Sequence, residues 1–179
     1  MGVLRVDHPD IEAFIQAKQE GDRLGNFNLS VAVTDAFMDA VYRNDVYDLV
    51  NPRTGDALGS LHAGDVFHAI QRAAWKSGDP GLLFLDAIQR DNPTLHVGEI
   101  QATNPCGEVP LLPFESCTLG SVNLSRMLRE ESGRMEIDWE RLRDPTHKAV
   151  RFLDDVIEVN RYPIPELERM ARGNRKIGL

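Results

Sequence analysis

Apolar residues recur at helical spacing in several stretches of the chain. The first such stretch predicts a helix from about Pro9 to Glu20, with proline in its first turn. A second helix is expected to be capped by Thr34, and a third is expected to end near Gly78. The remaining predicted helices are a short piece after residue 84, a longer amphipathic helix that contains residues 149–157, and a last helix from about Pro165 to Arg172.

Other stretches alternate or form short apolar runs, which is the pattern of β-strands. The stretch "GNFNLSVAV", residues 25–33, alternates so that Phe27 and the next three apolar residues share one side, opposite a polar or small side. Two short strands are expected around the "NPRTGD" turn of residues 51–56. The run "GLLF" at residues 81–84 is typical of a strand buried on both faces. Strands that alternate with helices predict an α/β fold with mostly parallel strands.

The strand pattern also occurs at both ends of the chain. Val3 and Leu4 begin one predicted strand, and Ile177 and Leu179 belong to another. A complete domain more often finishes with a cap or a polar tail. We therefore expect residues 1–179 to be an internal fragment of a larger domain, incomplete at both ends.

Composition narrows the classes of protein that fit this pattern. The chain has 28 acidic and 20 basic residues and a formal net charge of −8, which argues against a surface that binds nucleic-acid phosphates. No apolar run approaches the roughly 20 residues that span a bilayer, and the N-terminus lacks the layout of a secretory signal. We therefore expect a cytoplasmic protein without nucleic-acid or membrane partners.

Both cysteines lie in one segment punctuated by proline and glycine, "NPCGEVPLLPFESCTLGSVNL" at residues 104–124. Proline fixes its own φ and glycine favours unusual backbone angles, so Cys106 is expected on a tight loop. If that loop is extended, the side chains of Asn104, Cys106 and Glu108 project to the same face. The alternation in "ESCTLGSVNL" then predicts a strand with Cys117 on one face.

Several chemistries use cysteines, and the spacing separates them. In a reducing compartment the two thiols are expected to be free, catalytic or metal-bound rather than joined in a structural disulfide. A metal site is disfavoured because ten residues separate the thiols, no CxxC occurs, and His96 is the one histidine nearby. A cysteine hydrolase is disfavoured because the segment identifies neither a histidine base nor an oxyanion pocket. The alternative without chemistry is that each cysteine is a small buried apolar residue.

The cysteine segment resembles the central loop of ribonucleotide reductase large chains, specifically the adenosylcobalamin-dependent (class II) branch. The resemblance continues through "VDHPDIEAFIQAKQEGDRLGNFNLSVAVTDAFMDAV", "SGDPGLLFLDAIQRDNPT" and "NRYPIPELERMARGNRKIGL", and it covers nearly the whole chain. It implies a partial ribonucleotide reductase-type α/β barrel with a central finger loop that carries the radical cysteine. The start, "MGVLRV", resembles the middle of the family sequence.

The resemblance implies radical reduction of ribonucleoside di- or triphosphates to 2′-deoxyribonucleotides, with oxidation of a thiol pair to a disulfide. Cys106 matches the cysteine that becomes a thiyl radical and takes the 3′ hydrogen of the ribose. Glu108 matches the carboxylate that takes the 3′-hydroxyl proton, and Asn104 matches the amide that hydrogen-bonds the sugar hydroxyls. Cys117 matches one half of the dithiol that supplies the reducing equivalents.

The number of cysteines departs from the family pattern. The implied chemistry needs one radical thiol and a separate dithiol, whereas this chain has 2 cysteines. The partner of Cys117 is therefore expected upstream of Met1, and the phosphate-binding loop and a second cysteine pair are expected downstream. On this interpretation the fragment alone is inactive.

The resemblance also implies a cofactor and partners. The cofactor is adenosylcobalamin, whose contacts cannot be assigned to residues of this chain, and no metal ligands are expected. The implied partners are the ribonucleotide substrate, allosteric nucleotides that bind segments outside this chain, a thioredoxin-type reductant, and a second copy of the full-length enzyme in a homodimer. Two alternatives stay open, which are a large chain of the diiron-dependent (class I) branch and a catalytically inert truncated α/β module.

Overall fold

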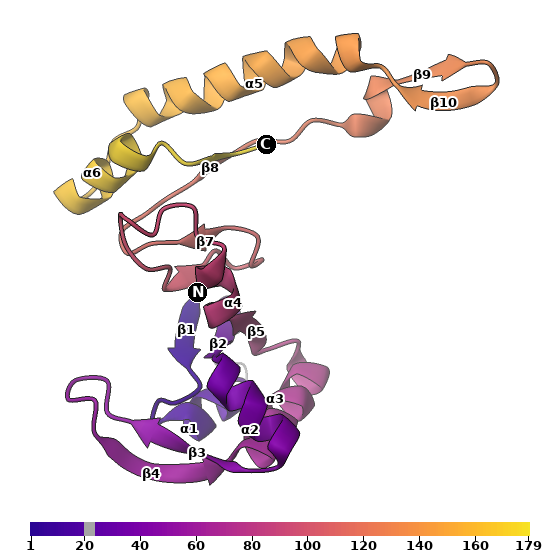
Figure 1. Ribbon diagram of the computed structural model, residues 1–179. Helices are drawn as coiled ribbons and strands as arrows, with labels where there is room; N and C mark the ends of the chain where they lie inside the picture. Colours follow the sequence, from indigo (N-terminus) through magenta and orange to yellow (C-terminus); the bar gives the residue numbers. More distant parts are fainter. Residues whose placement is uncertain (20–23) are drawn as a thin grey trace. The chain divides into compact units, whose positions relative to one another are not determined.

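The computed structural model describes residues 1–19 and 24–179 and divides into two compact units (Figure 1). The first unit is Met1–Pro113 and the second is Phe114–Leu179, and each is described by itself. Within the described ranges, no helix is both long enough and apolar enough to cross a membrane.

A three-stranded parallel sheet lies in the first unit (Figure 1). Its middle strand, β2 (Leu29–Val33), pairs with β1 (Gly2–Arg5) on one edge and with β5 (Gly81–Phe84) on the other. Every residue of β2 is buried, including Ser30. The prediction of one polar face for residues 25–33 is therefore wrong, because the strand begins at Leu29 and is covered on both faces.

The edge strand β5 also differs from its prediction. Gly81 and Phe84 are exposed, so the strand is not buried on both faces. Among the described strands only β2 pairs with β5, which leaves one edge of β5 without a neighbouring strand. A continuous apolar run is thus compatible with a partly exposed edge strand.

Four helices accompany this sheet in the described part of the first unit, namely α1 (Ile11–Gln16), α2 (Asp35–Arg43), α3 (Ala63–Ser77) and α4 (Leu85–Arg90). Two predicted helix ends are confirmed, since the Thr34 side chain accepts a hydrogen bond from the backbone N–H of Phe37 and α3 ends at Gly78 with φ of 83°. The first helix is shorter than predicted, because the Ala17 N–H bonds back only three residues, to the Phe14 carbonyl. Its predicted end at Glu20 lies outside the described residues.

The core of the first unit forms where these helices meet the sheet and a hairpin. The fully buried large side chains are Val6, Ile11, Ile15, Val31, Val33, Phe37 and Ile70. The hairpin consists of β3 (Val46–Val50) and β4 (Ala57–His62), which pair antiparallel around the predicted turn. From β3, the Tyr47 ring packs edge-on against Phe37 with ring centroids 4.9 Å apart.

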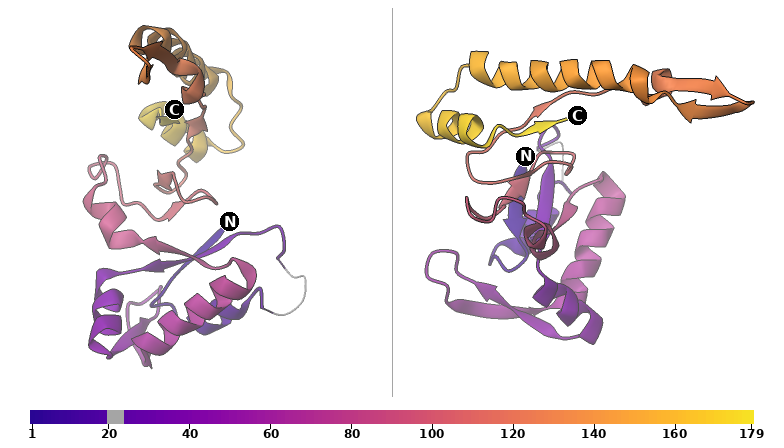
Figure 2. Two further views of the ribbon diagram at one scale, coloured as in Figure 1. Left: turned by 90° about the vertical axis from the view of Figure 1, so that its right-hand side faces the viewer. Right: turned by 45° about the horizontal axis from the view of Figure 1, so that its top comes forward.

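The second unit contains one long helix, α5 (Trp139–Val159), which runs along β8 and β11 (Figures 1 and 2). Its other elements are β8 (Thr118–Leu119), the 3-10 helix η1 (Leu124–Met127), β9 (Leu128–Glu131), β10 (Arg134–Ile137), α6 (Pro165–Asn174) and β11 (Ile177–Gly178). The strand predicted in "ESCTLGSVNL" is reduced to the two residues of β8. The physical reason is that the end of the stretch turns into η1, where the Asn123 side chain accepts a hydrogen bond from the Ser125 N–H.

The strand pairings decide the fold class. Parallel pairs occur in β1–β2–β5 and in β8–β11, whereas β3–β4 and β9–β10 are antiparallel, as are β6 (Ala102–Thr103) and β7 (Pro110–Leu111). The α/β prediction is confirmed as a mixed α/β fold, but the strands are not mostly parallel. The described strands do not close into a barrel.

Candidate active site

The predicted site residues Asn104, Cys106 and Glu108 lie on one tight loop of the first unit. The loop connects β6 to β7, which pair antiparallel, so the chain leaves and returns at the same place. Backbone hydrogen bonds close its base, from the Asn104 N–H to the Val109 carbonyl at 3.2 Å and from the Gln101 N–H to the Leu111 carbonyl at 3.1 Å. The tight loop that proline and glycine predicted is confirmed.

Inside the loop, Asn104 organises the backbone. Its side-chain Oδ1 accepts a hydrogen bond from the Val109 N–H at 3.0 Å, and its carbonyl accepts one from the Gly107 N–H at 3.0 Å. Gly107 has φ of 85°, a conformation that favours glycine. Pro105 and Cys106 form a turn, so the extended geometry assumed for the loop is wrong. The carboxamide oxygen of Asn104 is thereby engaged within the loop.

The loop combines a buried base with an exposed tip. Ile100, Thr103 and Val109 are buried around the base, whereas Cys106 and Glu108 are exposed. The Thr103 hydroxyl donates to the Asn104 carbonyl at 2.9 Å and further fixes the first residue of the loop. The thiol and the carboxylate are therefore presented on a well-anchored loop, where a ligand or another segment can reach them.

The fourth predicted site residue, Cys117, belongs to the second unit. It is half-buried, and its Sγ lies 3.9 Å from the Thr118 carbonyl oxygen. Burial raises the pKa of the Cys117 thiol, the Lys176 ammonium opposes this rise, and the Glu115 carboxylate adds to it. The thiol is thus favoured over the thiolate at this position.

Sequence reasoning missed a buried charged cluster beside Cys117. The Glu115 side chain has an exposed fraction of 0% and forms an ion pair with Lys176, with Oε2 2.6 Å from Nζ. The Asn174 side-chain amide donates to Glu115 Oε1 at 2.7 Å. The available signal was the spacing, because Glu115 precedes its cysteine by two residues just as Glu108 follows Cys106 by two.

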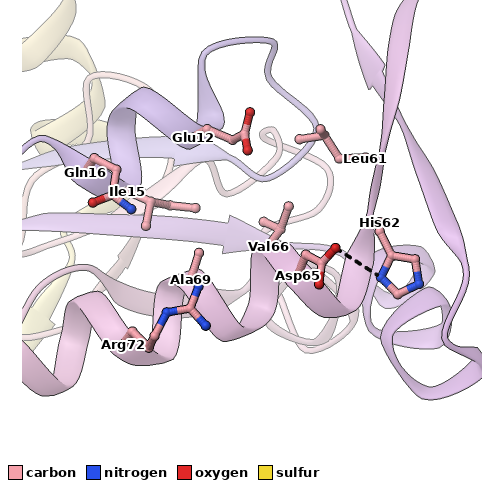
Figure 3. Close-up of a pocket in the computed structure, with 9 residues that line it drawn as sticks. All are labelled: Glu12, Ile15, Gln16, Leu61, His62, Asp65, Val66, Ala69 and Arg72. Carbon is pink, nitrogen blue, oxygen red and sulfur yellow. Dashed lines mark ion pairs between the residues drawn. The ribbon is translucent and has the colours of Figure 1, made fainter.

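The first unit also has a hollow away from the loop. Its volume is about 350 Å³. Figure 3 shows side chains that line it, among them Glu12 from α1 and Arg72 from α3. His62 Nδ1 lies 3.9 Å from Asp65 Oδ2, and its Nε2 lies 3.2 Å from the Asn44 carbonyl. None of the four predicted site residues lines this hollow. Elsewhere in the described residues, no group of three or more His, Cys, Asp or Glu side chains is placed to hold a metal ion.

Comparison with known proteins gives a match over the whole chain. The family model described as "Ribonucleotide reductase, barrel domain" matches residues 1–179. The chain is 59% identical over 180 residues to a protein of Mycobacterium tuberculosis (strain ATCC 25618 / H37Rv) named vitamin B12-dependent ribonucleoside-diphosphate reductase. It is 49% identical over 180 residues to a protein of the same name from Thermoplasma acidophilum. A vitamin B12-dependent ribonucleotide reductase of Streptomyces coelicolor is 30% identical over 203 residues.

Coverage is unequal in these matches. Each of the three includes 100% of this chain but only 25%, 23% and 21% of the respective relative. The chain therefore spans about a quarter of the length of these relatives.

Proposed function

The chain belongs to the ribonucleotide reductase barrel-domain family, and we propose that it forms part of the catalytic chain of an adenosylcobalamin-dependent ribonucleoside-diphosphate reductase. The reaction is the reduction of a ribonucleotide to a 2′-deoxyribonucleotide and water, while two thiols become one disulfide. Diphosphate substrates and the cobalamin-dependent branch are supported by the names of the relatives that are 49% and 59% identical. The diiron-dependent branch is not favoured, because the relatives described above are all named vitamin B12-dependent.

The single observation that carries this proposal is the loop of residues 104–109, with Asn104, Cys106 and Glu108 on one anchored hairpin. In the proposed reaction the Cys106 thiyl radical takes the 3′ hydrogen of the ribose. An S–H bond and the sugar C–H bond are of similar strength, so this hydrogen can move in both directions. Glu108 then takes the 3′-hydroxyl proton, while a proton from the thiol pair joins the 2′-hydroxyl, which departs as water. A base so placed increases the rate by about 10²- to 10⁴-fold.

The two remaining residues, Asn104 on the loop and Cys117 in the second unit, have distinct tasks in the proposed reaction. Asn104 uses its carboxamide oxygen to accept the Val109 N–H, so we assign its amide N–H₂ to the sugar hydroxyls. Cys117 supplies one half of the dithiol, whose partner lies in another part of the longer chain. A thioredoxin-type protein then returns the disulfide to the dithiol in a reducing cytoplasm.

We further propose that residues 1–179 are an internal part of the catalytic barrel and that the hairpin is its central finger loop. A thiyl radical must be kept from water and oxygen, so a site around Cys106 needs enclosure. The exposed position of Cys106 is compatible with this, because the chain covers 25% of the Mycobacterium relative. The remaining sequence of such a chain would supply the walls, the allosteric nucleotide sites and the contacts of the homodimer.

The cofactor is compatible with the residues of the loop, although none of them is assigned as its ligand. The exposed Cys106 thiol can exchange a hydrogen atom with a group that approaches from outside this chain. When bound, adenosylcobalamin supplies the radical that starts turnover. The loop contributes the position of the thiol, and Glu108 contributes the base.

Activity of the natural full-length protein tests the proposal. With adenosylcobalamin, a dithiol and a ribonucleoside diphosphate, we expect deoxyribonucleotide formation without any second protein. An absolute requirement for a separate metalloprotein would assign the chain to the diiron-dependent branch. Absence of product under both conditions would favour an inert α/β module.

A further inference from the structure

The second unit buries a carboxylate that has no assigned role in the proposed reaction. Glu115 lies two residues before Cys117, and its side chain is completely buried. It holds the Lys176 ammonium at 2.6 Å and receives a hydrogen bond from the Asn174 amide at 2.7 Å. A buried ion pair contributes little net stability compared with apolar packing, so its presence here needs another explanation.

The same cluster is attached to the backbone around Cys117. The Thr118 N–H donates to the Lys176 carbonyl at 3.2 Å, and β8 continues in register with β11. A Cβ atom on Gly178 would lie 3.8 Å from Cys117 Sγ, which places the sulfur directly against β11. The backbone that carries Lys176 is therefore fixed to the backbone that carries Cys117.

Other charged groups lie on α5, which packs against β8 and β11, since His147, Lys148, Arg151, Asp154 and Asp155 line a hollow together with Ile177. On α5, which packs against β8, Asp154 and Glu158 are both paired with Arg175. The charged groups that influence the Cys117 thiol are Lys176, which favours the thiolate, and Glu115, which disfavours it. Both residues of the ion pair thus act on one sulfur, with opposite signs.

We propose that Lys176 and Glu115 are positioning residues that set the ionisation of Cys117. Asn174 donates to Glu115 and orients its carboxylate, Glu115 holds the Lys176 ammonium beside the strand pair, and Lys176 favours the charged form of the sulfur. The inference deepens the proposed function, because it assumes that Cys117 belongs to the reducing dithiol. In thiol–disulfide exchange the ionisation of each sulfur controls its rates of attack and departure.

Because Lys176 and Glu115 carry opposite charges, removing each charge should shift the pH midpoint for ionisation of Cys117 in opposite directions. This difference distinguishes an electrostatic effect from damage to the fold. Lys176→Met removes the cation and leaves the carboxylate, so the pH midpoint for ionisation of Cys117 should rise. Glu115→Gln keeps the shape and the hydrogen bond from Asn174 but removes the anion, so the midpoint should fall. Damage to the fold alone would move both variants in the same direction.

The experiment measures the alkylation rate of Cys117 against pH in the natural full-length protein, after reduction with a phosphine. Cleavage after Glu108 separates Cys106 from Cys117, and mass spectrometry then follows each thiol. We expect shifts of at least about half a pH unit, upward for Lys176→Met and downward for Glu115→Gln. Lys176→Arg should stay near the parent value. Lys148→Met, which removes an exposed lysine of α5, serves as the matched control and should leave the midpoint unchanged.

Each outcome is decisive. Unchanged midpoints, or shifts of the same sign in both variants, would overturn the inference. If Lys176→Met does not fold, the isosteric Glu115→Gln variant decides alone, and a midpoint that fails to fall contradicts the proposal. The titration does not depend on turnover, so a protein that reduces ribonucleotides with unchanged midpoints would refute only this inference. A protein that shows the shifts but no reductase activity would refute only the proposed function.

Discussion

At the scale of single residues, Asn104 combines a structural contact with a proposed catalytic one. Its Oδ1 satisfies the Val109 N–H, and Val109 is buried. Leaving a buried N–H without a partner costs about 1–3 kcal/mol. The amide group that remains is the one assigned to the substrate, so substitutions at this position can separate the two contributions.

We predict that Asn104→Ala lowers the free energy of unfolding by about 1–3 kcal/mol, whereas Asn104→Asp keeps most of the stability. The aspartate retains an oxygen acceptor for the Val109 N–H but has no amide donor for the sugar. Urea unfolding of both variants measures the first effect, and turnover of the natural full-length protein measures the second. Equal stability of the two variants would show that the loop does not depend on this hydrogen bond.

Tyr47 gives a prediction about pH. Its hydroxyl donates to the Val6 carbonyl at 3.0 Å, and burial, together with the carboxylates of Asp7 and Glu12, raises the pKa of Tyr47 above its ordinary value. Because the folded-state pKa is the higher one, this contribution to stability is complete below about pH 10 and is lost as the pH rises toward the folded-state pKa.

We therefore expect the free energy of unfolding to fall as the pH is raised above about 10, and to fall less steeply in Tyr47→Phe. The phenylalanine keeps the edge-on contact with Phe37 but cannot ionise. Urea unfolding curves recorded across this pH range provide the test. The same slope in both proteins would mean that other groups cause the alkaline loss.

At the scale of elements, the sequence predicted features that depend on neighbouring residues better than features that depend on strand pairing. The Thr34 cap, the Gly78 helix end and the hairpin turn depend on residues that are near one another in sequence, and all three are confirmed. Strand lengths and burial depend on the partner strand. The sequence around Cys117 could not reveal that only Thr118 and Leu119 of this stretch form a strand, nor that β5 forms an edge. The side-chain bond of Asn104 likewise depends on the turn that the loop adopts.

The long helix of the second unit contains a proline that local rules would place at a helix end. Pro145 lies inside α5, where it cannot donate a hydrogen bond to the carbonyl of Arg141. We predict that Pro145→Ala raises the free energy of unfolding of this unit by up to about 3 kcal/mol. Arg143→Ala, at an exposed position of the same helix, is the matched control and should change stability by less than about 0.5 kcal/mol. Urea unfolding followed by circular dichroism measures both, and a destabilised Pro145→Ala variant would contradict the prediction.

At the scale of the whole molecule, the family was recognisable from the sequence because the cysteine loop is a dense, specific motif. The matches over residues 1–179 confirm that resemblance. The proposed enclosure of the loop was harder to predict from the sequence, since the walls of a barrel would come from strands distant in sequence. Several large apolar side chains are exposed in the structure, including Trp75 at 91% and Phe152 at 67%. Apolar surface of this kind is typical of faces that contact another segment or another chain.

The count of sulfur atoms leads to a prediction for the chain of 179 residues by itself. The proposed reaction needs one thiol for the radical and two more to deliver the reducing equivalents, and the chain has 2 cysteines. If Cys106 and Cys117 formed a disulfide, no thiol would remain to carry the radical. If Cys106 carried the radical, Cys117 would lack its partner.

We therefore expect no deoxyribonucleotide from this chain with adenosylcobalamin, a ribonucleoside diphosphate and excess dithiol, while the natural full-length protein serves as the positive control. Product is measured by chromatography and compared with a reaction from which the protein is omitted. Product above that level would mean that the external dithiol can replace the partner of Cys117. The assignment of a protein dithiol would then have to be abandoned.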